Sequence, residues 1–325
     1  MLRLIACCVI SAPSTPFSVH GFAREVNFGV VFQQPLISIL DNVFYTLILM
    51  ANLTFRRKMK INYQETSTDL MKRIDIHNQY GGRNIDEWML KLLGLTSGIK
   101  ILDAACGAGK QVNSFYNELK GDADITGGDV SKELLEKAKQ ESQKNQVKAT
   151  FVDLDFNKPF KFANDRFDLL SCCFAIYYAE DIAFTIREMH RVLKTGGRLF
   201  TTGPMPQNKQ IFYEVIKEAT NSKPIPAMPG SSRYGSEILE TIKKQFANVE
   251  VHIFENPLTF TKAEPFLEYT RASLSEDRKL WGDFFKGKQD FEHIMSQIER
   301  VTRERIARDG ELVMTKVVGG FIATK

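Results

Sequence analysis

One short segment, residues 101–109, constrains the fold of this chain more than any other part of it. It begins with an apolar run that ends in Asp103, continues through small residues to Gly107 and Gly109, and leads into a stretch with a helical pattern. This order predicts a buried strand that turns directly into a helix N-terminus, where backbone N–H groups and the helix dipole favour an anion. The glycines let the backbone approach a ligand, because they have no Cβ in the way.

Three classes of ligand-binding loop share this outline, and the residues around the glycines separate them. A P-loop needs a glycine, four residues and then Gly-Lys-Ser/Thr, but Ala104 stands at the first glycine position and Gln111 at the Ser/Thr position. A dinucleotide-binding loop needs Gly or Ala at its third position, where this chain has Val112. The pattern D-x-x-C-G-x-G, from Asp103 to Gly109, instead resembles the first motif of class I S-adenosylmethionine (AdoMet)-dependent methyltransferases.

Later segments resemble the same family in the same order. The segment 124–129 is similar to the second strand of the family and ends in Asp129, twenty positions after Gly109. The segments 151–156, 167–178 and 187–200 are similar to the third strand, the fourth strand with its substrate-facing loop, and the helix, glycine turn and fifth strand of the family. The resemblance spans roughly residues 62–325. It implies a Rossmann-like, seven-stranded, mostly parallel sheet with helices on both faces, an antiparallel last strand and a helical cap or lid.

The hydrophobic pattern supports an α/β fold independently of the resemblance. Strand-like and helix-like segments alternate after residue 98, which favours a parallel sheet covered by helices. Strands are expected at 100–106, 123–129, 149–154, 167–173, 197–203, 249–255 and about 315–323. Helices are expected within 65–95 and at 109–119, 131–144, 180–194, 207–219 and 235–245. Ligands bind at the carboxyl ends of strands in such sheets.

The chain is predicted to have an extension, residues 1–58, before a helical cap at 59–97 and a methyltransferase domain at 98–325. A helical insert at about 262–310 either packs on the domain or forms a lid over its active site, and the pattern does not choose between the two. Residues 28–53 are largely apolar, but Asp41 lies within them, and an Asp at a bilayer centre costs about 3 kcal/mol. Arg56-Arg57-Lys58 is what an in-frame, purine-rich ribosome-binding site would encode. We therefore hypothesise that translation starts at Met59, with a membrane anchor as the main alternative.

Composition and charge limit the classes of partner expected for this chain. With 43% hydrophobic and 25% charged residues the chain is globular. After residue 58 it carries 38 basic and 37 acidic residues and no basic stripe, so a nucleic-acid substrate is disfavoured. Its five cysteines show no disulfide spacing and are expected to be reduced thiols rather than metal ligands. We expect a cytoplasmic protein, a monomer or homodimer, with no membrane partner and no metal.

The resemblance implies which residues hold the cofactor, AdoMet, and its product S-adenosylhomocysteine. Asp103 is expected to face the ammonium group, Gly107 and Gly109 the methionine end, and Asp129 the two ribose hydroxyls. Asp155 and the Phe156 amide are expected to read adenine, with Asp153 as the alternative reader. Three further positions complete the expected cofactor site: Ala105, Val130 and Ser171.

Two further segments supply candidate substrate-side residues. Arg73 and His77 lie four apart on a predicted helix and therefore share a face. Together with Tyr80 they match an Arg…His-x-x-Tyr run of similar family members, in which Arg73 would pair with the cofactor carboxylate and His77 would act as general base. Tyr178, which follows the fourth strand beside Tyr177, is the other candidate catalytic residue; all of these side chains are also compatible with simple packing.

The predicted function is transfer of a methyl group from AdoMet to a small molecule, with oxygen and nitrogen as the expected acceptor atoms. Methyl transfer from a sulfonium is an in-line displacement, so position, orientation and water exclusion are the main tasks of the protein. A catalytically silent AdoMet-binding regulator is the first alternative. A nicotinamide-dependent oxidoreductase is the second, and Val112 disfavours it.

Overall fold

The computed structural model describes residues 67–325, except for 227, 277–280 and 282–283. These residues belong to one compact unit, Lys58–Lys325, which is described here by itself. The predicted extension at 1–58 and the first part of the predicted cap lie outside the described residues. Among the helices of the described ranges, none has an apolar stretch long enough to span a bilayer.

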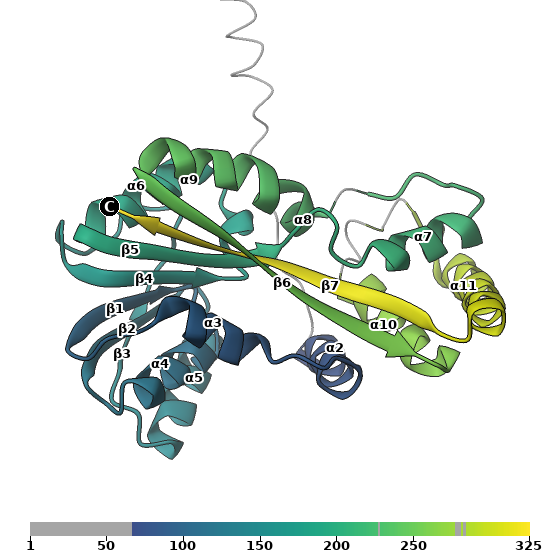
Figure 1. The fold of residues 1–325 in the computed structure, drawn as a ribbon, viewed down its shortest axis with the longest axis horizontal. Coiled ribbons are helices and arrows are strands. Elements are labelled where there is room, and N and C mark those ends of the chain that lie inside the picture. The colour runs from purple at the N-terminus through teal and green to yellow at the C-terminus, as the bar shows by residue number, and fades with distance from the viewer. Residues whose placement is uncertain (1–66, 227, 277–280, 282–283) are drawn as a thin grey trace, which may run out of the picture. The chain divides into compact units, whose positions relative to one another are not determined.

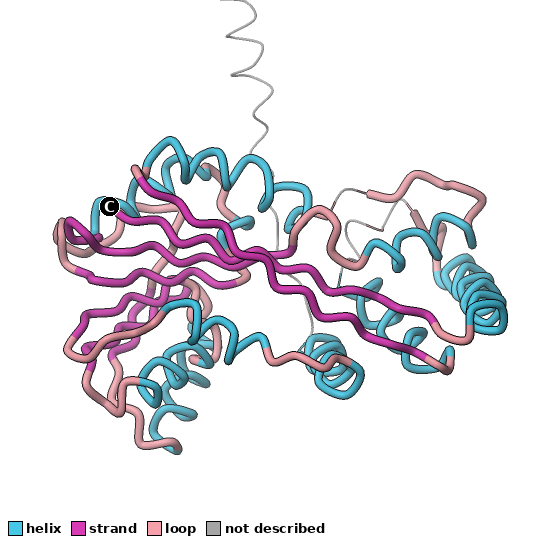
Figure 2. Tube along the Cα trace, in the orientation of Figure 1, coloured by secondary structure: helices cyan, strands magenta, loops and turns pink. Residues whose placement is uncertain are grey.

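A seven-stranded sheet in the order β3-β2-β1-β4-β5-β7-β6 forms the centre of the unit (Figures 1 and 2). Strands β1 to β5 pair in parallel, whereas β7 runs antiparallel to both β5 and β6. The predicted fold class is therefore confirmed. The strands are β1 Ile99–Ala104, β2 Ala123–Asp129, β3 Thr150–Asp153, β4 Phe167–Cys173, β5 Leu193–Pro204, β6 Asn248–Phe260 and β7 Leu312–Thr324.

Consecutive apolar residues in the central strands bury both faces of the sheet, as a parallel sheet requires. In β1, Ile101 points into one hydrophobic core and Leu102 into the other, and both side chains are fully buried. Successive strand residues point to opposite faces, so an unbroken apolar run serves two layers of helices. One layer contains α3 (Ile85–Leu93), α4 (Lys110–Glu118) and α5 (Lys132–Lys144), and the other contains α6 (Ile182–Val192) and α9 (Leu239–Gln245).

Side-chain caps define where several helices begin. The Asn84 side chain accepts hydrogen bonds from the Asp86 and Glu87 amides at the start of α3. Ser131 and Asp181 cap α5 and α6 in the same way. Such caps satisfy amides that have no partner within the helix. The start of α4 differs, because its N-cap is Gly109 and no side chain caps it.

Strands β6 and β7 are longer than predicted and run on beyond β5 as a two-stranded ribbon (Figure 1). The sixth strand was predicted to end near residue 255, but β6 continues through Pro257, although proline lacks the N–H that a ladder uses. Strand β6 is however the last in the sheet order, and edge strands tolerate proline. In β6, Pro257 is paired in register with Thr315 of β7.

The ribbon supports a second hydrophobic core, which we call the helical subdomain. It contains α2 (Ser67–Tyr80), α7 (Gln210–Ala219), α10 (Ala263–Glu276) and α11 (Lys288–Asp309), gathered around the far halves of β6 and β7 (Figure 1). Leu258 and Met314 of the ribbon are fully buried there against residues such as Phe266 and Ile298. Helices α10 and α11 form the insert expected between the last two strands. The burial of these apolar faces explains why the insert is a structured layer.

The predicted helix at 235–245 is divided in the structure. A short α8 (Pro229–Arg233) leads into a π-helical turn, η2 (Tyr234–Ile238), and only then into α9. The reason is Tyr234, whose buried ring stacks on Phe321 at 4.4 Å and whose hydroxyl lies 2.8 Å from Thr201 Oγ1. This tertiary contact outweighs regular α-helical geometry.

Candidate functional site

The loop after β1 is fastened to the end of β2. The Ala105 and Cys106 amides both donate to the Gly128 carbonyl, at 2.7 and 2.9 Å. The Gly107 amide donates to Asp129 Oδ2 at 2.9 Å. Gly107 has φ +54° and open space where a Cβ would stand, so a ligand can approach its backbone. The loop and Asp129, the last residue of β2, therefore form one unit.

Asp129 is the central polar group of this unit. It is buried, and its second oxygen, Oδ1, accepts the Ser131 amide at 2.9 Å. Ser131 in turn caps α5. A carboxylate has about four lone-pair positions, and these two bonds use half of them. Asp129 therefore has acceptor capacity left for two further donors, as the two hydroxyls of a ribose would require.

Asp103 lies beside it on β1 and is almost fully buried. The pKa of Asp103 is raised to about 7, and burial is the largest cause. The hydrogen bond from the Ser171 hydroxyl lowers the pKa, and the nearby charge of Asp129 raises it. A buried carboxylate with a raised pKa is stabilised in its ionised form by a cation. Ser171 is itself fully buried, and its hydroxyl donates to Asp103 Oδ1.

The segment after β3 carries the predicted adenine-reading group. Asp155 Oδ1 accepts the Asn157 amide at 3.0 Å, and Oδ2 pairs with Lys158 Nζ at 3.0 Å. Partial burial raises the pKa of Asp155, but these two partners outweigh burial and leave the pKa below its usual value. Phe156 is anchored by its carbonyl, which accepts the Thr185 hydroxyl at 3.0 Å.

Val130 provides an apolar surface at the same edge. It follows Asp129 directly and is 65% exposed, more than any other large hydrophobic side chain among the described residues. A nucleoside has a base with apolar faces and a polar sugar. An exposed valine could pack against such a base while the neighbouring buried carboxylate accepts hydrogen bonds from the sugar.

The loop after β4 is held in an unusual conformation. Phe174 has φ +55°, and its amide donates to the Thr202 carbonyl at 2.8 Å. The rings of Tyr177 and Tyr178 lie 4.7 Å apart. Arg233, which sequence reasoning did not single out, donates through Nη1 to the carbonyls of Tyr177 and Ala179 at 2.8 and 3.0 Å. The loop is thus positioned by α8 as well as by the sheet.

Helix α2 brings His77 to the helical subdomain. The His77 ring lies 5.4 Å from the Tyr269 ring of α10, and its Nδ1 is buried with no hydrogen-bond partner among the described residues. The pKa of His77 is lowered to about 2. Burial is the largest cause, and the positive charges of Lys316, Lys209 and Arg73 act in the same direction. His77 is therefore neutral across the physiological range.

Two lysines that the sequence patterns did not indicate lie near His77. Lys209 is the N-cap residue of α7. Its amide donates to the Thr315 carbonyl at 3.0 Å, and its ammonium lies 5.6 Å from the Tyr269 ring. Lys316, the next residue on β7, is half-buried, and its ammonium lies 5.8 Å from the Phe174 ring. We call Arg73, Lys209 and Lys316 the cation cluster.

The pKa of Lys316 is lowered to about 8, mainly by burial and also by the charges of Arg73, Lys209 and Lys110. Asp86 acts in the opposite direction, but it is paired with Lys110 at 2.7 Å. No local signal marked these lysines, because only the pairing of β6 with β7 and the placement of α2 and α7 bring the cluster together.

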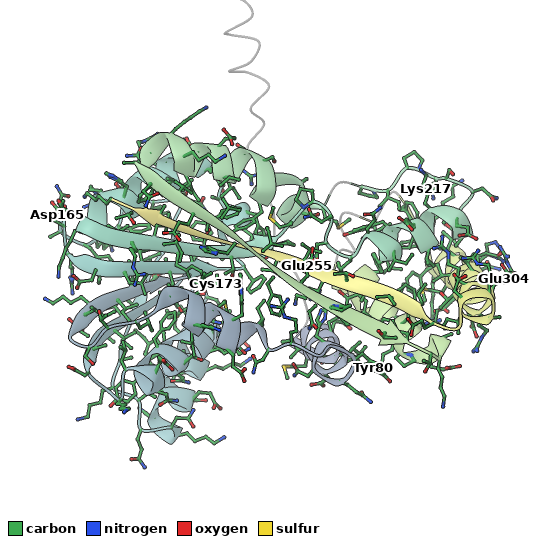
Figure 3. All side chains as sticks on the ribbon, in the orientation of Figure 1. Tyr80, Asp165, Cys173, Lys217, Glu255 and Glu304 are labelled. Atoms are coloured by element: carbon green, nitrogen blue, oxygen red, sulfur yellow. The ribbon has the colours of Figure 1, made fainter. Side chains whose placement is uncertain are left out.

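The helical subdomain is fixed beside the sheet by a reciprocal contact. The Arg83 amide donates to Asn256 Oδ1, and Asn256 Nδ2 donates to the Arg83 carbonyl, each at 3.2 Å. Asn256 is the register partner of Lys316. Figure 3 labels Cys173, the last residue of β4, and Tyr80, the last residue of α2. Phe174, which follows Cys173, contacts Lys316, and α2 contains Arg73 of the cation cluster.

Comparisons with known proteins agree with this geometry. A family model described as a methyltransferase domain matches residues 95–263. A demethylmenaquinone methyltransferase from Chlorobaculum parvum is 30% identical over 159 residues, which cover 46% of this chain and 61% of that protein. A polyketide synthase-nonribosomal peptide synthetase from Aspergillus clavatus is 31% identical over 122 residues, which cover 36% of this chain and 3% of that protein. The chain therefore spans less than two thirds of either relative.

A solved structure gives a comparison of folds only. The Haemonchus contortus phosphoethanolamine N-methyltransferase 2, in complex with S-adenosyl-L-methionine, shares 20% identity with this chain at a TM-score of 0.46. The match covers 80% of this chain and 57% of that one. A sequence identity of 20% and a TM-score of 0.46 support no conclusion about the activity of this chain.

Proposed function

Because this chain belongs to the methyltransferase domain family, within the class I AdoMet-dependent superfamily, we propose that it transfers the methyl group of AdoMet to an oxygen or nitrogen of a small molecule. The observation that carries the proposal is the contact between Asp129 and Gly107. It joins the glycine loop to the acidic end of β2 at 2.9 Å and leaves the carboxylate able to accept two more hydrogen bonds.

The residues present fit the cofactor. Asp103 is suited to the ammonium group, because a cation offsets the cost of ionising a buried carboxylate. The open space at Gly107 suits the methionine end, and Asp129 suits the ribose. Val130, Asp155 and Phe156 would surround adenine, and the uncapped amides of α4 suit a carboxylate.

When bound, AdoMet supplies an activated methyl group on a sulfonium. The chain has to place the acceptor in line with that methyl, exclude water and receive the proton that the acceptor loses. The loop containing Tyr178 and the facing surface of the helical subdomain are the proposed walls of this acceptor site. The insert between β6 and β7 then serves as a lid rather than as packing alone.

We propose that His77 accepts a hydrogen bond from the group of the acceptor that loses its proton. Its neutral ring and unpaired Nδ1 can accept a hydrogen bond from a hydroxyl or amine. A general base must also keep the proton, and a pKa of about 2 makes His77 a poor one in the free protein. We therefore propose that His77 orients the acceptor, and that it becomes a base only when bound negative charge offsets its cationic neighbours.

The test combines binding with turnover. Calorimetry on the full chain should show binding of AdoMet and S-adenosylhomocysteine and none of NAD at the same concentration. A radiolabelled methyl-transfer assay over a metabolite panel should then identify an acceptor. Binding of NAD without AdoMet would overturn the proposal. Binding of AdoMet without transfer to any small molecule, but with an effect on a protein partner, would favour the regulatory alternative.

A further inference from the structure

One long side of strand β6 has no neighbouring strand in the described part of the chain. β6 is the last strand in the sheet order, and its register with β7 runs without a shift from Asn248 to Phe260. The side that faces away from β7 therefore presents a row of backbone N–H and C=O groups. Such an edge can pair with a further strand, and proteins usually cover or interrupt it.

Two hydrogen bonds show which residues of β6 turn their backbone groups outward. Arg83 Nη1 donates to the Glu255 carbonyl at 2.7 Å, and Glu255 is labelled in Figure 3. The carbonyl of its register partner Val317 accepts the Met205 amide at 3.0 Å, on the side of β5. Glu255 and Val317 are therefore a pair that does not exchange backbone bonds, and Glu255 points its backbone groups away from β7. Because the direction alternates along an antiparallel pair, every second residue from Glu255 does the same.

The two halves of this edge differ in how they are covered. Toward the helical subdomain, Gly81 forms an isolated antiparallel bridge with Leu258, and Arg83 bonds to the Glu255 carbonyl. Pro257 also removes one outward N–H in this half. Among the described residues, no segment bonds to the outward backbone groups of residues 248–254. We call residues 248–254 the open edge.

The side chains of the open edge suit contact with another strand. Val251 and Ile253 are 43% and 41% exposed, and they are two of five large hydrophobic side chains that are exposed among the described residues. Val249 points to the same face, since alternate strand residues share a face. On the opposite face, a Glu250 carboxylate oxygen lies 3.2 Å from His252 Nε2. The open edge has no proline, lysine or bulge, which are common protections of an edge.

We propose that two copies of this chain form a symmetric dimer in which the open edge pairs antiparallel with the open edge of the second copy. This inference goes beyond methyl transfer and does not depend on it. A two-fold axis at Val251 places Val251 opposite its own copy, Val249 opposite the partner's Ile253 and Glu250 opposite the partner's His252. Outward backbone groups then meet outward backbone groups, as an antiparallel ladder requires. Apolar side chains meet apolar ones, and each carboxylate meets an imidazole N–H, pairs that stabilise adjacent strands.

The sequence of the open edge favours this register over its neighbours. An axis at Glu250 would place two glutamates directly opposite each other, which is destabilising. An axis at His252 would place Val249 opposite the partner's Glu255, whose carbonyl already accepts Arg83. The axis at Val251 avoids both conflicts and pairs all seven residues of the open edge. Symmetric two-fold dimers of this kind are the commonest oligomers.

The arrangement leaves each copy with its own ligand edge. β5 and β6 run in the same direction, because each is antiparallel to β7. An antiparallel partner strand reverses the whole second sheet, so the carboxyl ends of the parallel strands face opposite ways in the two copies. A pairing of one short edge is small for a specific interface, and a micromolar dissociation constant is therefore expected.

The first test is sedimentation of the full chain at concentrations from below to above the micromolar range. The wild type should show a monomer–dimer equilibrium. Val251→Lys should raise the dissociation constant of the dimer by about tenfold or more, because it places two like charges at the axis. Val313→Lys is the matched control: Val313 is 39% exposed and lies in the far half of the ribbon, opposite Thr259. It should change the constant by less than about twofold.

The second test measures the register by disulfide formation under mild oxidation. Val251→Cys should give a covalent dimer, because opposed residues of this type have Cα atoms about 5.5 Å apart, within the range of a disulfide. Ile253→Cys is similarly exposed, but its two copies would be displaced by about 13 Å along the strands, so it should not cross-link. Wild type oxidised in parallel accounts for links through the native cysteines.

A monomer at every concentration would overturn the inference, as would a dimer that Val251→Lys and Val313→Lys affect equally. Equal cross-linking of Val251→Cys and Ile253→Cys would also overturn it. The melting temperature in dilute solution shows whether each variant is folded, and if Val251→Lys is not, the cysteine pair decides. These measurements use neither AdoMet nor turnover, so a failure of the proposed function would leave them interpretable.

Discussion

At the scale of single residues, the site depends on carboxylates whose surroundings differ. Asp129 is buried but bonded to two backbone amides, whereas Asp103 is buried with one serine hydroxyl. Asp155 is partly exposed and paired with Lys158. These surroundings suit three different parts of one cofactor, and each can be tested separately.

Asp129→Ala should weaken AdoMet binding by roughly 1.5–3 kcal/mol, the scale of lost hydrogen bonds to a charged group. The substitution removes the expected ribose acceptor and also releases the Gly107 amide. Calorimetry on the folded variant measures the effect, with Asp124→Ala as control because Asp124 is an exposed residue at the other end of the same strand. An unchanged dissociation constant for Asp129→Ala would place the ribose elsewhere.

AdoMet binding should tighten as the pH rises from about 6 to 8. The folded pKa of Asp103 is about 7, above its usual value of 3.8, so the free protein holds this proton at pH 6 and loses it as the pH rises to 8. In the free protein this favours the folded state at low pH, and the stabilisation is lost as the pH rises from about 4 towards 7. The cationic cofactor prefers the ionised carboxylate and must displace the proton.

The control for this pH dependence is Asp103→Asn. It should bind AdoMet more weakly and show little change in affinity over the same pH range. A wild-type affinity that is flat from pH 6 to 8 would show that Asp103 does not face the cationic part of the cofactor.

His77→Ala should lower kcat by about 10²–10⁴ with little change in AdoMet affinity, if His77 accepts the acceptor proton. His77→Asn separates the two roles proposed for this side chain, since it keeps a hydrogen-bond acceptor but cannot take the proton. Near-normal turnover of His77→Asn would assign orientation to His77. Loss of turnover in both variants, at unchanged affinity for cofactor and acceptor, would assign it general-base catalysis.

At the scale of elements, the ribbon of β6 and β7 connects two cores. One half of it completes the sheet beside β5, and the other half carries α2, α7, α10 and α11. The proposed cofactor residues come from β1 to β4 and their loops, apart from Arg73 on α2. His77 and the proposed lid over the acceptor come instead from α2, α10 and α11. Cofactor binding and acceptor binding are thereby assigned largely to different elements.

This division predicts a selective effect of core truncation. Ile298→Ala in α11 should lower the free energy of unfolding by about 2–5 kcal/mol, because Ile298 is fully buried in the helical subdomain. AdoMet affinity should change by less than about twofold where the variant is folded, whereas turnover should fall. Denaturant unfolding and calorimetry check the two parts, and a large loss of AdoMet affinity would contradict the division.

At the scale of the whole molecule, much of the order of the chain was predictable. Strand β4 was located at its observed bounds, Phe167–Cys173, and Asp103 and Asp129 were placed at or next to the carboxyl ends of β1 and β2. These features are local, since strand burial, a glycine turn and a helix start each leave a pattern within a few residues. Family membership, the fold class and the cofactor followed from the resemblance of these motifs, in their order, to those of class I AdoMet-dependent methyltransferases.

Only the tertiary structure decided the rest. Strand β6 runs past its predicted end and through Pro257, which the edge position of β6 tolerates, and the predicted helix at 235–245 begins with a π-helical turn in which Tyr234 stacks on Phe321. Lys209 and Lys316 carried no local signal, because an ordinary lysine becomes a site residue only when distant elements enclose it. By itself the sequence determined which cofactor this protein is built to hold, through residues close together in the chain. The approach of Lys209 and Lys316 to His77 depends on contacts between residues far apart in the chain, and those exist only once the two cores have formed.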